Sequence, residues 1–188
     1  MQLDEKTFLK MAEDTGELVF FDIESYSLSP DYGSMLVFSG LPYNATKATT
    51  FSVTTGGVGN DRKVVREAVE YLNQKACWCS FYGKMFDVPF IRARLLKWNM
   101  DLELIKKHHI DLYWVIRANV NPARKSQAHL LDWLKVDTRK MSVSADDWSE
   151  VGQKPSSIRV LRQRCESDVF GLRDLYKRTK QFVGNIQR

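Results

Sequence analysis

The chain has 188 residues, of which 44% are hydrophobic and 27% are charged. This length and composition predict a single globular domain over residues 1–188 and argue against disorder, fibrous repeats and a transmembrane span, and the acidic N-terminus does not resemble a signal peptide. The net charge of +5 favours a polyanionic partner, and three cysteines without metal or redox spacing (Cys77, Cys79 and Cys165) indicate buried thiols in a soluble cytoplasmic protein.

Strand signals dominate the first part of the chain. Residues 18–24 (LVFFDIE) are dense in apolar and aromatic side chains and predict a buried central strand. Residues 34–40 and 48–54 predict two further strands, separated by the turn-forming sequence Pro42-Tyr43-Asn44. Because the links between these three strands are short, we expect antiparallel neighbours.

Helices and strands alternate in the rest of the chain, and this order indicates an α/β sandwich around a mixed sheet. Apolar residues recur at helical spacing after residue 61, and the last helix carries an apolar stripe. The predicted elements are a helix capped by Asn60 or Asp61, a strand at 76–82, a helix at Val88–Trp98, a strand or helix entry at 109–116, a helix at about Ser126–Leu134 and a last helix at roughly Ser157–Val183.

Two carboxylates lie on the first predicted strand. Asp22 and Glu24 are two residues apart, and because side chains alternate along a strand both should project from the same face. Desolvation and mutual repulsion disfavour two charges there, and a bound cation or a shared proton resolves the conflict. The simpler interpretation is that a turn begins at Ile23 and both acids face water.

Two further acids stand on predicted helices. Asp87 begins the helix after the fourth strand, and by itself it is explained as a helix cap. Asp168 lies on or beside the apolar stripe of the last helix, where a carboxylate needs a basic side chain or a metal. Arg164, four residues earlier, offers an ordinary i,i+4 ion pair as the alternative.

Taken together, these motifs resemble the DEDD superfamily of 3′-5′ exonucleases, which includes polymerase proofreading domains, RNase D and small ribonuclease-H-like nucleases of bacteria and phages. The resemblance covers about residues 18–178 and implies a ribonuclease-H-like fold, in which helices flank a mixed five-stranded sheet. The matching segments are Asp22-Ile23-Glu24, Tyr82-Gly83-Lys84-Met85-Phe86-Asp87-Val88-Pro89-Phe90, His109-Ile110-Asp111-Leu112-Tyr113 and Asp168-Val169.

The resemblance implies a metal-dependent 3′-5′ exonuclease that hydrolyses single-stranded DNA or RNA ends to 5′-mononucleotides, with DNA favoured. Two divalent cations are implied, one held mainly by Asp22, Glu24 and Asp168. The second would be held by Asp22 with water and phosphate oxygens, while Asp87 would act through metal-bound water. Carboxylate oxygens suit Mg²⁺ or Mn²⁺, which would activate the attacking water and stabilise the leaving 3′ oxygen.

One position departs from the pattern of the family. Its members orient the attacking water with a Tyr four residues, or a His five residues, before the last Asp. Here those positions hold Arg164 and Gln163. Activity is then weakened or lost unless Arg164 or another group, such as His108, substitutes, and Arg164 is therefore a candidate catalytic residue.

Aromatic and basic side chains near the acids are candidates for nucleic-acid binding, because base stacking tolerates any sequence and cations contact phosphates. For each aromatic residue, core packing is the simpler alternative, and Phe86 in particular is expected in the core. The candidates are Tyr26, Tyr82, Arg92, Arg124 and Lys125, with Arg94 also on an element that would border the cleft.

Two other functions stay open at this stage. A catalytically silent module would keep the fold and bind nucleic acid or a protein partner, although four retained acids favour the enzyme. A structure-specific endonuclease would share the carboxylate chemistry but does not require the Phe86–Phe90 motif. A replication or repair partner is left open.

Overall fold

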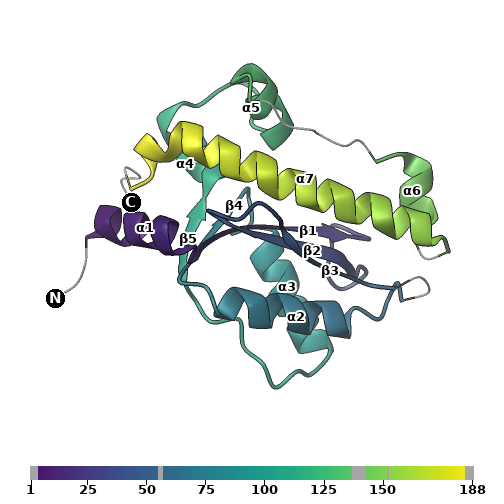
Figure 1. Ribbon diagram of the computed structural model, residues 1–188. Helices are drawn as coiled ribbons and strands as arrows, with labels where there is room; N and C mark the ends of the chain where they lie inside the picture. Colours follow the sequence, from purple (N-terminus) through teal and green to yellow (C-terminus); the bar gives the residue numbers. More distant parts are fainter. Residues whose placement is uncertain (1–3, 55–56, 137–142, 152, 185–188) are drawn as a thin grey trace.

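A mixed sheet forms the centre of the protein (Figure 1). The computed structural model describes residues 4–54, 57–136, 143–151 and 153–184, and within them the strands lie in the order β3-β2-β1-β4-β5. β1 to β3 pair antiparallel, whereas β4 and β5 run parallel to β1. This arrangement confirms the predicted five-stranded α/β fold. The strands are β1 (Leu18–Ser25), β2 (Met35–Pro42), β3 (Thr49–Ser52), β4 (Cys77–Ser80) and β5 (His108–Asp111).

Helices cover both faces of this sheet. The long helix α7 (Pro155–Thr179) lies along one face, and α2 (Arg62–Asn73) and α3 (Asp87–Lys97) lie on the other (Figure 1). Among the described residues, no helix is long and apolar enough to cross a membrane. The remaining helices are α1 (Glu5–Thr15), α4 (Leu112–Asn119), α5 (Gln127–Trp133), α6 (Ala145–Ser149) and the short 3₁₀ turn η1 (Lys180–Phe182).

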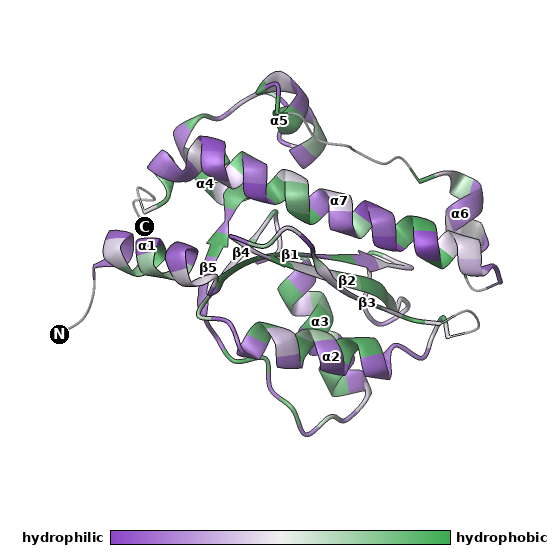
Figure 2. Ribbon diagram, viewed as in Figure 1, coloured by the Kyte–Doolittle hydropathy of each residue, from purple (hydrophilic) through white to green (hydrophobic). Residues whose placement is uncertain are grey.

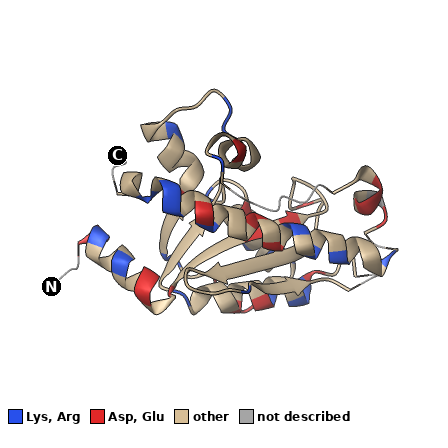
Figure 3. Ribbon diagram, turned by 45° about the horizontal axis from the view of Figure 1, so that its top comes forward, with Lys and Arg blue, Asp and Glu red and all other residues tan. Residues whose placement is uncertain are grey.

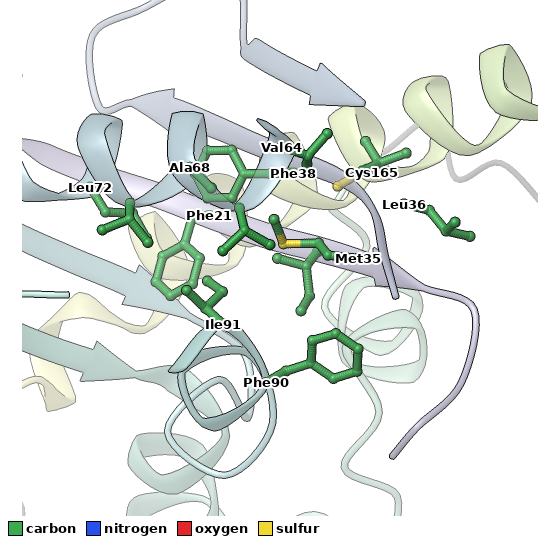
Figure 4. Close-up of a cluster of buried hydrophobic side chains, with 14 of the residues drawn as sticks. Phe21, Met35, Leu36, Phe38, Val64, Ala68, Leu72, Phe90, Ile91 and Cys165 are labelled. Carbon is green, nitrogen blue, oxygen red and sulfur yellow. The ribbon is translucent and has the colours of Figure 1, made fainter. Parts of the chain in front are cut away.

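β1 is buried because strands flank it on both sides and helices cover both of its faces. Phe21 packs in the core with α2 and α3, where it meets Phe38 and Ile91 (Figure 4). Phe20 packs in the second core cluster, with residues of α7. Since residues two apart in a strand share a face, the strand presents Asp22 and Glu24 on the side of α7.

The apolar stripe predicted for the last helix is confirmed. Every residue of the stripe is fully or almost fully buried, at the period of an α-helix. In Figure 2, hydrophobic and hydrophilic residues alternate along α7, as expected for a helix with one face on a sheet. The helix begins two residues earlier than predicted, and η1 replaces its predicted end. The stripe consists of Leu161, Cys165, Val169, Leu172 and Tyr176.

Two helices were not predicted. α1 is capped by Asp4, whose Oδ1 accepts the Thr7 N–H at 3.0 Å, and α6 begins with a capping box formed by Ser144 and Asp147. Both are short, and tertiary packing, which sequence periodicity does not report, stabilises most short helices. The 109–116 segment contains both predicted alternatives, since β5 leads directly into α4. Part of the polar segment predicted before the last helix, residues 137–142, lies outside the described residues.

The structure corrects the predictions made for Asp61 and Arg94. Asp61 stands at the N-cap of α2, but its side chain makes no capping bond. Its carboxylate instead pairs with Arg94, and both side chains are fully buried. Arg94 therefore does not border a cleft, because an arginine on α3 that reaches a buried acid is part of the interior. The three cysteines are buried free thiols, as predicted.

Candidate metal centre

Three carboxylates from two elements converge at the end of β1. Asp22 and Glu24 come from β1 and Asp168 comes from α7. One oxygen of each side chain lies within 4.8 Å of the other two. Glu24 is only 6% exposed. The two strand acids therefore share a face, as predicted, and the alternative in which both simply face water is wrong.

Asp87 lies next to this group and is tied to the same strand. Its Oδ1 accepts the backbone N–H of Ile23, between the two strand acids, at 3.2 Å. The turn before α3 brings Asp87 close because Gly83 lacks a side chain: a Cβ there would overlap Ser80 Oγ and lie 3.1 Å from Asp87 Oδ2. Asp87 is buried, so it is more than a surface helix cap.

Burial makes ionisation of these acids costly. It raises the pKa of Glu24 to about 7, although the neighbouring Arg164 opposes the shift. Burial also raises the pKa of Asp87 to about 7. The pKa of Asp22 lies well above its ordinary value, first because of burial and then because of the charges of Asp87 and Asp168. A cation among these oxygens would relieve the repulsion.

Arg164 contacts two acids of the cluster. Its Nε lies 2.8 Å from Glu24 Oε1 and 3.7 Å from Asp168 Oδ2. The predicted i,i+4 pair with Asp168 is thus present, but the shorter contact crosses from the helix to the strand. The guanidinium also lies over the ring of Trp148, 5.8 Å from its centroid. One third of the Arg164 side chain is exposed, so it lies at the entrance of the site.

The acids fit a divalent metal. Glu24 Oε1 is buried and makes no hydrogen bond with any described residue, since Arg164 Nε approaches it without hydrogen-bond alignment. Buried oxygens without a hydrogen bond are rare and often mark a missing ion. The three converging groups are all carboxylates, the donor type preferred by Mg²⁺ and Mn²⁺, and the neighbouring Cys165 thiol donates to the Asp22 carbonyl at 3.3 Å.

A pocket of about 400 Å³ opens over the three acids. Tyr26, a predicted binding residue, lines it with an exposed ring, and Phe86, expected in the core, is half-buried and also lines it. Trp148 was missed by the sequence analysis, although the capping box at Ser144 marks the start of its helix. The lining residues are Asp22, Ile23, Glu24, Ser25, Tyr26, Ser27, Leu28, Phe86, Trp148, Arg164 and Asp168.

The other predicted binding residues lie outside this pocket. Tyr82, which precedes α3, and Arg92, in the middle of that helix, are both exposed. Arg124 and Lys125 come just before α5, whose Gln127 amide donates to the backbone carbonyl of Asp168 at 2.9 Å.

His108, expected as one possible substitute for the Tyr or His of the family pattern, lies away from the acids. It lies on β5, where its Nε2 is 3.3 Å from Glu5 Oε1, and it does not line the pocket of the acids. Sequence alone could not exclude it, because the order of strands in the sheet decides which side chains reach the site. β4 separates β5 from β1 in the sheet.

Comparisons with known proteins agree on the fold. A family model described as the RNase H superfamily matches residues 19–179. No curated protein is detectably similar in sequence. The solved structure of a family B DNA polymerase from the hyperthermophilic archaeon Pyrobaculum calidifontis superimposes with a TM-score of 0.69 at 16% identity, over 86% of this chain and 24% of the polymerase chain. This chain thus spans about a quarter of the polymerase, and the likeness concerns the fold alone.

Proposed function

Since this chain belongs to the RNase H superfamily, we propose that it is a metal-dependent 3′-5′ exonuclease that converts single-stranded nucleic acid ends, DNA in preference to RNA, to 5′-mononucleotides. The observation that carries the proposal is the convergence of Asp22, Glu24 and Asp168 within 4.8 Å in an open pocket. The resemblance of the motifs to DEDD exonucleases supports the 3′-5′ direction.

In this proposal the acids bind the cations, and Arg164 contributes charge alone. Asp22, Glu24 and Asp168 would hold two divalent cations, with Asp87 acting through water. Such cations generate a nucleophile at neutral pH and stabilise the charge on the leaving oxygen. The bond between Asp87 Oδ1 and the Ile23 N–H fixes the carboxylate of Asp87 beside β1. Arg164 cannot accept a proton, so any catalytic contribution from it is electrostatic.

Nucleic acid would bind at the rim of the pocket. Tyr26 is exposed at the pocket and offers a stacking surface, and stacking contributes roughly 1–3 kcal/mol per base. Tyr82, Arg92, Arg124 and Lys125 would contact the strand farther from the acids. The net charge of +5 suits such a polyanion, although positive and negative side chains alternate along α7 (Figure 3).

The second candidate is a catalytically silent binding module. The observation that favours it is Arg164, which stands where a water-orienting tyrosine is expected and already contacts Glu24 at 2.8 Å. An arginine that occupied the acids permanently would keep the cations out.

A gel assay separates these functions. Single-stranded DNA and RNA, labelled at the 5′ or the 3′ end, would be incubated with Mg²⁺, Mn²⁺ or EDTA. The exonuclease predicts a descending ladder from the 5′ label, immediate release of mononucleotide from the 3′ label, and no reaction in EDTA. Early internal fragments would support an endonuclease, and binding without cleavage would support the silent module.

A further inference from the structure

An aromatic cluster lies at the same edge of the sheet as the metal centre. The parallel strands β1, β4 and β5 all end at this edge, and the segments that follow β4 and β5 bring together Tyr82, Tyr113 and Trp114. The Tyr82 ring centroid is 4.9 Å from that of Tyr113 and 6.3 Å from that of Trp114, against which it stacks. We call these three residues the aromatic platform.

The platform faces solvent although its rings are large and apolar. Tyr82 is 42% exposed, and Tyr113 and Trp114 are each partly exposed. Exposed aromatic residues are ordinary one at a time, but here three rings in mutual contact, Tyr82 stacked on Trp114 and Tyr113 edge-on to both, form one aromatic surface suited to a binding partner.

The backbone at Tyr82 is strained. Its φ of +66° lies in the left-handed region, which Gly or Asn adopts at lower cost than a bulky residue. Such strain costs on the order of 1–3 kcal/mol and is typical of functional sites. A tyrosine here lowers stability, and what distinguishes it from Asn or Gly is its exposed ring.

One buried carboxylate holds the platform together. Asp111 Oδ1 accepts the N–H of Tyr82 at 2.8 Å and that of Tyr113 at 3.1 Å, while Oδ2 accepts the N–H of Lys84 at 3.0 Å. Asp111 therefore joins the two segments that carry the rings, because both of its carboxylate oxygens accept hydrogen bonds from backbone N–H groups of these segments.

One cation lies against the rings and others lie along β5. The Arg117 guanidinium lies over Trp114, 5.2 Å from the ring centroid. A pocket of about 660 Å³ along β5 is lined by Lys84, Lys106 and Lys107, and also by Asp111 and a second acid, Glu5. The three lysines and Arg117 outnumber the two acids, Asp111 and Glu5, so the surface favours a polyanion.

A single turn connects the platform with the metal centre. The N–H groups of Met85 and Phe86 both donate to the Tyr82 carbonyl at 3.1 Å. Phe86 lines the pocket of the acids, and Asp87 follows it directly. The turn therefore places Tyr82 four residues before Phe86, at the same edge of the sheet as the acids.

We propose that the aromatic platform stacks bases of single-stranded nucleic acid on the 5′ side of the bond cleaved at the metal centre, with Arg117 and Lys84 contacting phosphates. The inference rests on the proposed function, because it places the 3′ end of the same strand at the acids. Aromatic stacking with cations along the backbone is how single strands are bound without sequence preference. Asp111 is a positioning residue, since it acts through the segments that it holds.

Binding is tested in EDTA, where no cleavage is required. A fluorescent oligonucleotide of about 12 nucleotides, a length within the range of single-strand binding sites, is titrated with each variant and followed by anisotropy. Tyr82→Asn removes the ring but tolerates the positive φ, so it should melt no lower than the wild type. We expect Tyr82→Asn and Trp114→Ala each to weaken binding about tenfold. Tyr82→Phe, which keeps the ring, is the matched control and should change binding less than about twofold.

The cations and Asp111 give independent readouts. Arg117→Gln should reduce the slope of log K against log salt by about 0.7, as loss of one phosphate contact does for single strands. Lys63→Gln, an exposed lysine of α2, removes the same charge elsewhere and should leave the slope unchanged. Asp111→Ala should weaken binding like loss of a ring, and Asp111→Asn, which keeps one acceptor oxygen, should restore part of it.

The outcomes separate this inference from the proposed nuclease. If Tyr82→Asn and Trp114→Ala bind like the wild type, the platform is overturned whether or not the protein cleaves. If they lose binding while the wild type cleaves nothing, the platform stands and the nuclease fails. If the wild type binds no oligonucleotide even at low salt, the nucleic-acid assignment is overturned, and the rings would then fit a protein partner.

Discussion

Two buried charged clusters of this protein differ in how completely the chain satisfies them. Asp61 and Arg94 form a bidentate pair with two N–O distances of 2.8 Å. Asp61 also accepts the Met35 N–H and the Trp98 Nε1–H, both at 2.7 Å, and Arg94 donates to the Pro30 carbonyl at 2.9 Å. In the candidate metal centre, by contrast, Arg164 forms ion pairs with Glu24 and Asp168. Glu24 Oε1 makes no hydrogen bond with any described residue.

This difference distinguishes a structural ion pair from a binding site. The Asp61–Arg94 cluster is closed by the chain itself, so it joins α2 and α3 to the loop after β1 and to the start of β2. The candidate metal centre is left open by the chain, since the pKa values of Asp22 and Glu24 are raised and Glu24 Oε1, although 2.8 Å from Arg164 Nε, makes no hydrogen bond with any described residue. A binding site must be of this open kind, because a ligand can bind only where the chain leaves side-chain oxygens available.

The largest effect expected is on activity. Asp22→Ala or Asp168→Ala should abolish metal-dependent cleavage, a loss of at least about a thousandfold, because each removes an oxygen of the open cluster. Circular dichroism should show a folded protein, since neither acid is required to close the core. A variant that cleaves at the wild-type rate in the gel assay would remove that carboxylate from the site.

The closed cluster should instead determine stability. Arg94→Ala leaves Asp61 buried without its cation, which costs about 3–5 kcal/mol. Arg92→Ala, two residues away and exposed, is the control and should stay within about 0.5 kcal/mol of the wild type. Denaturant unfolding measures both. Equal stabilities would show that the Asp61–Arg94 pair does not have the structural role assigned to it.

Arg164 sharpens the comparison, because it is the cation that the chain offers to the open cluster. We expect it to be a placeholder, so Arg164→Ala should leave the cleavage rate nearly intact, and Arg164→Tyr should raise it. If its guanidinium steadies the scissile phosphate, Arg164→Ala should instead lower the rate by about 10²–10³. Such a loss with unchanged Mn²⁺ affinity would overturn the placeholder assignment.

A pH series in EDTA should reveal how much the ionisation of buried Glu24 lowers the stability of the fold. Burial raises the folded-state pKa of Glu24 from 4.5 to about 7, so the folded state holds a proton that the unfolded state has lost between these values. This contribution to stability is complete below about pH 4.5 and is lost as the pH rises through 7. Glu24→Gln should therefore melt above the wild type at pH 8, and the difference should shrink towards pH 5. A difference independent of pH would contradict the assignment.

The sequence predicted the fold because its signals are local. A dense run of apolar and aromatic residues identified β1, which is buried on both faces, and the 3.6-residue stripe identified α7, which is buried on one face. Asp22, Glu24 and Asp168 were found for the same reason: strand alternation and helix spacing place them on the α7 side of the sheet.

What the sequence did not predict depends on contacts between distant segments. The pair of Asp61 with Arg94 crosses from α2 to α3, and the contact of Arg164 with Glu24 crosses from α7 to β1. Asp111 could be read as part of a motif, but its bonds to Tyr82 and Lys84 require the order of β4 and β5 in the sheet. Spacing along the chain reports none of these partners.

The most direct test of an open cluster that requires a cation is the melting midpoint of the wild type and of Asp22→Asn, each measured in EDTA and in Mn²⁺. In EDTA the variant should melt higher, because one repelling charge is gone. Saturating Mn²⁺ should raise the wild-type midpoint, by roughly 2.7 kcal/mol of added stability at a hundred times the dissociation constant, and that of the variant much less. Wild-type and variant midpoints that do not respond even to millimolar Mn²⁺ would contradict the account.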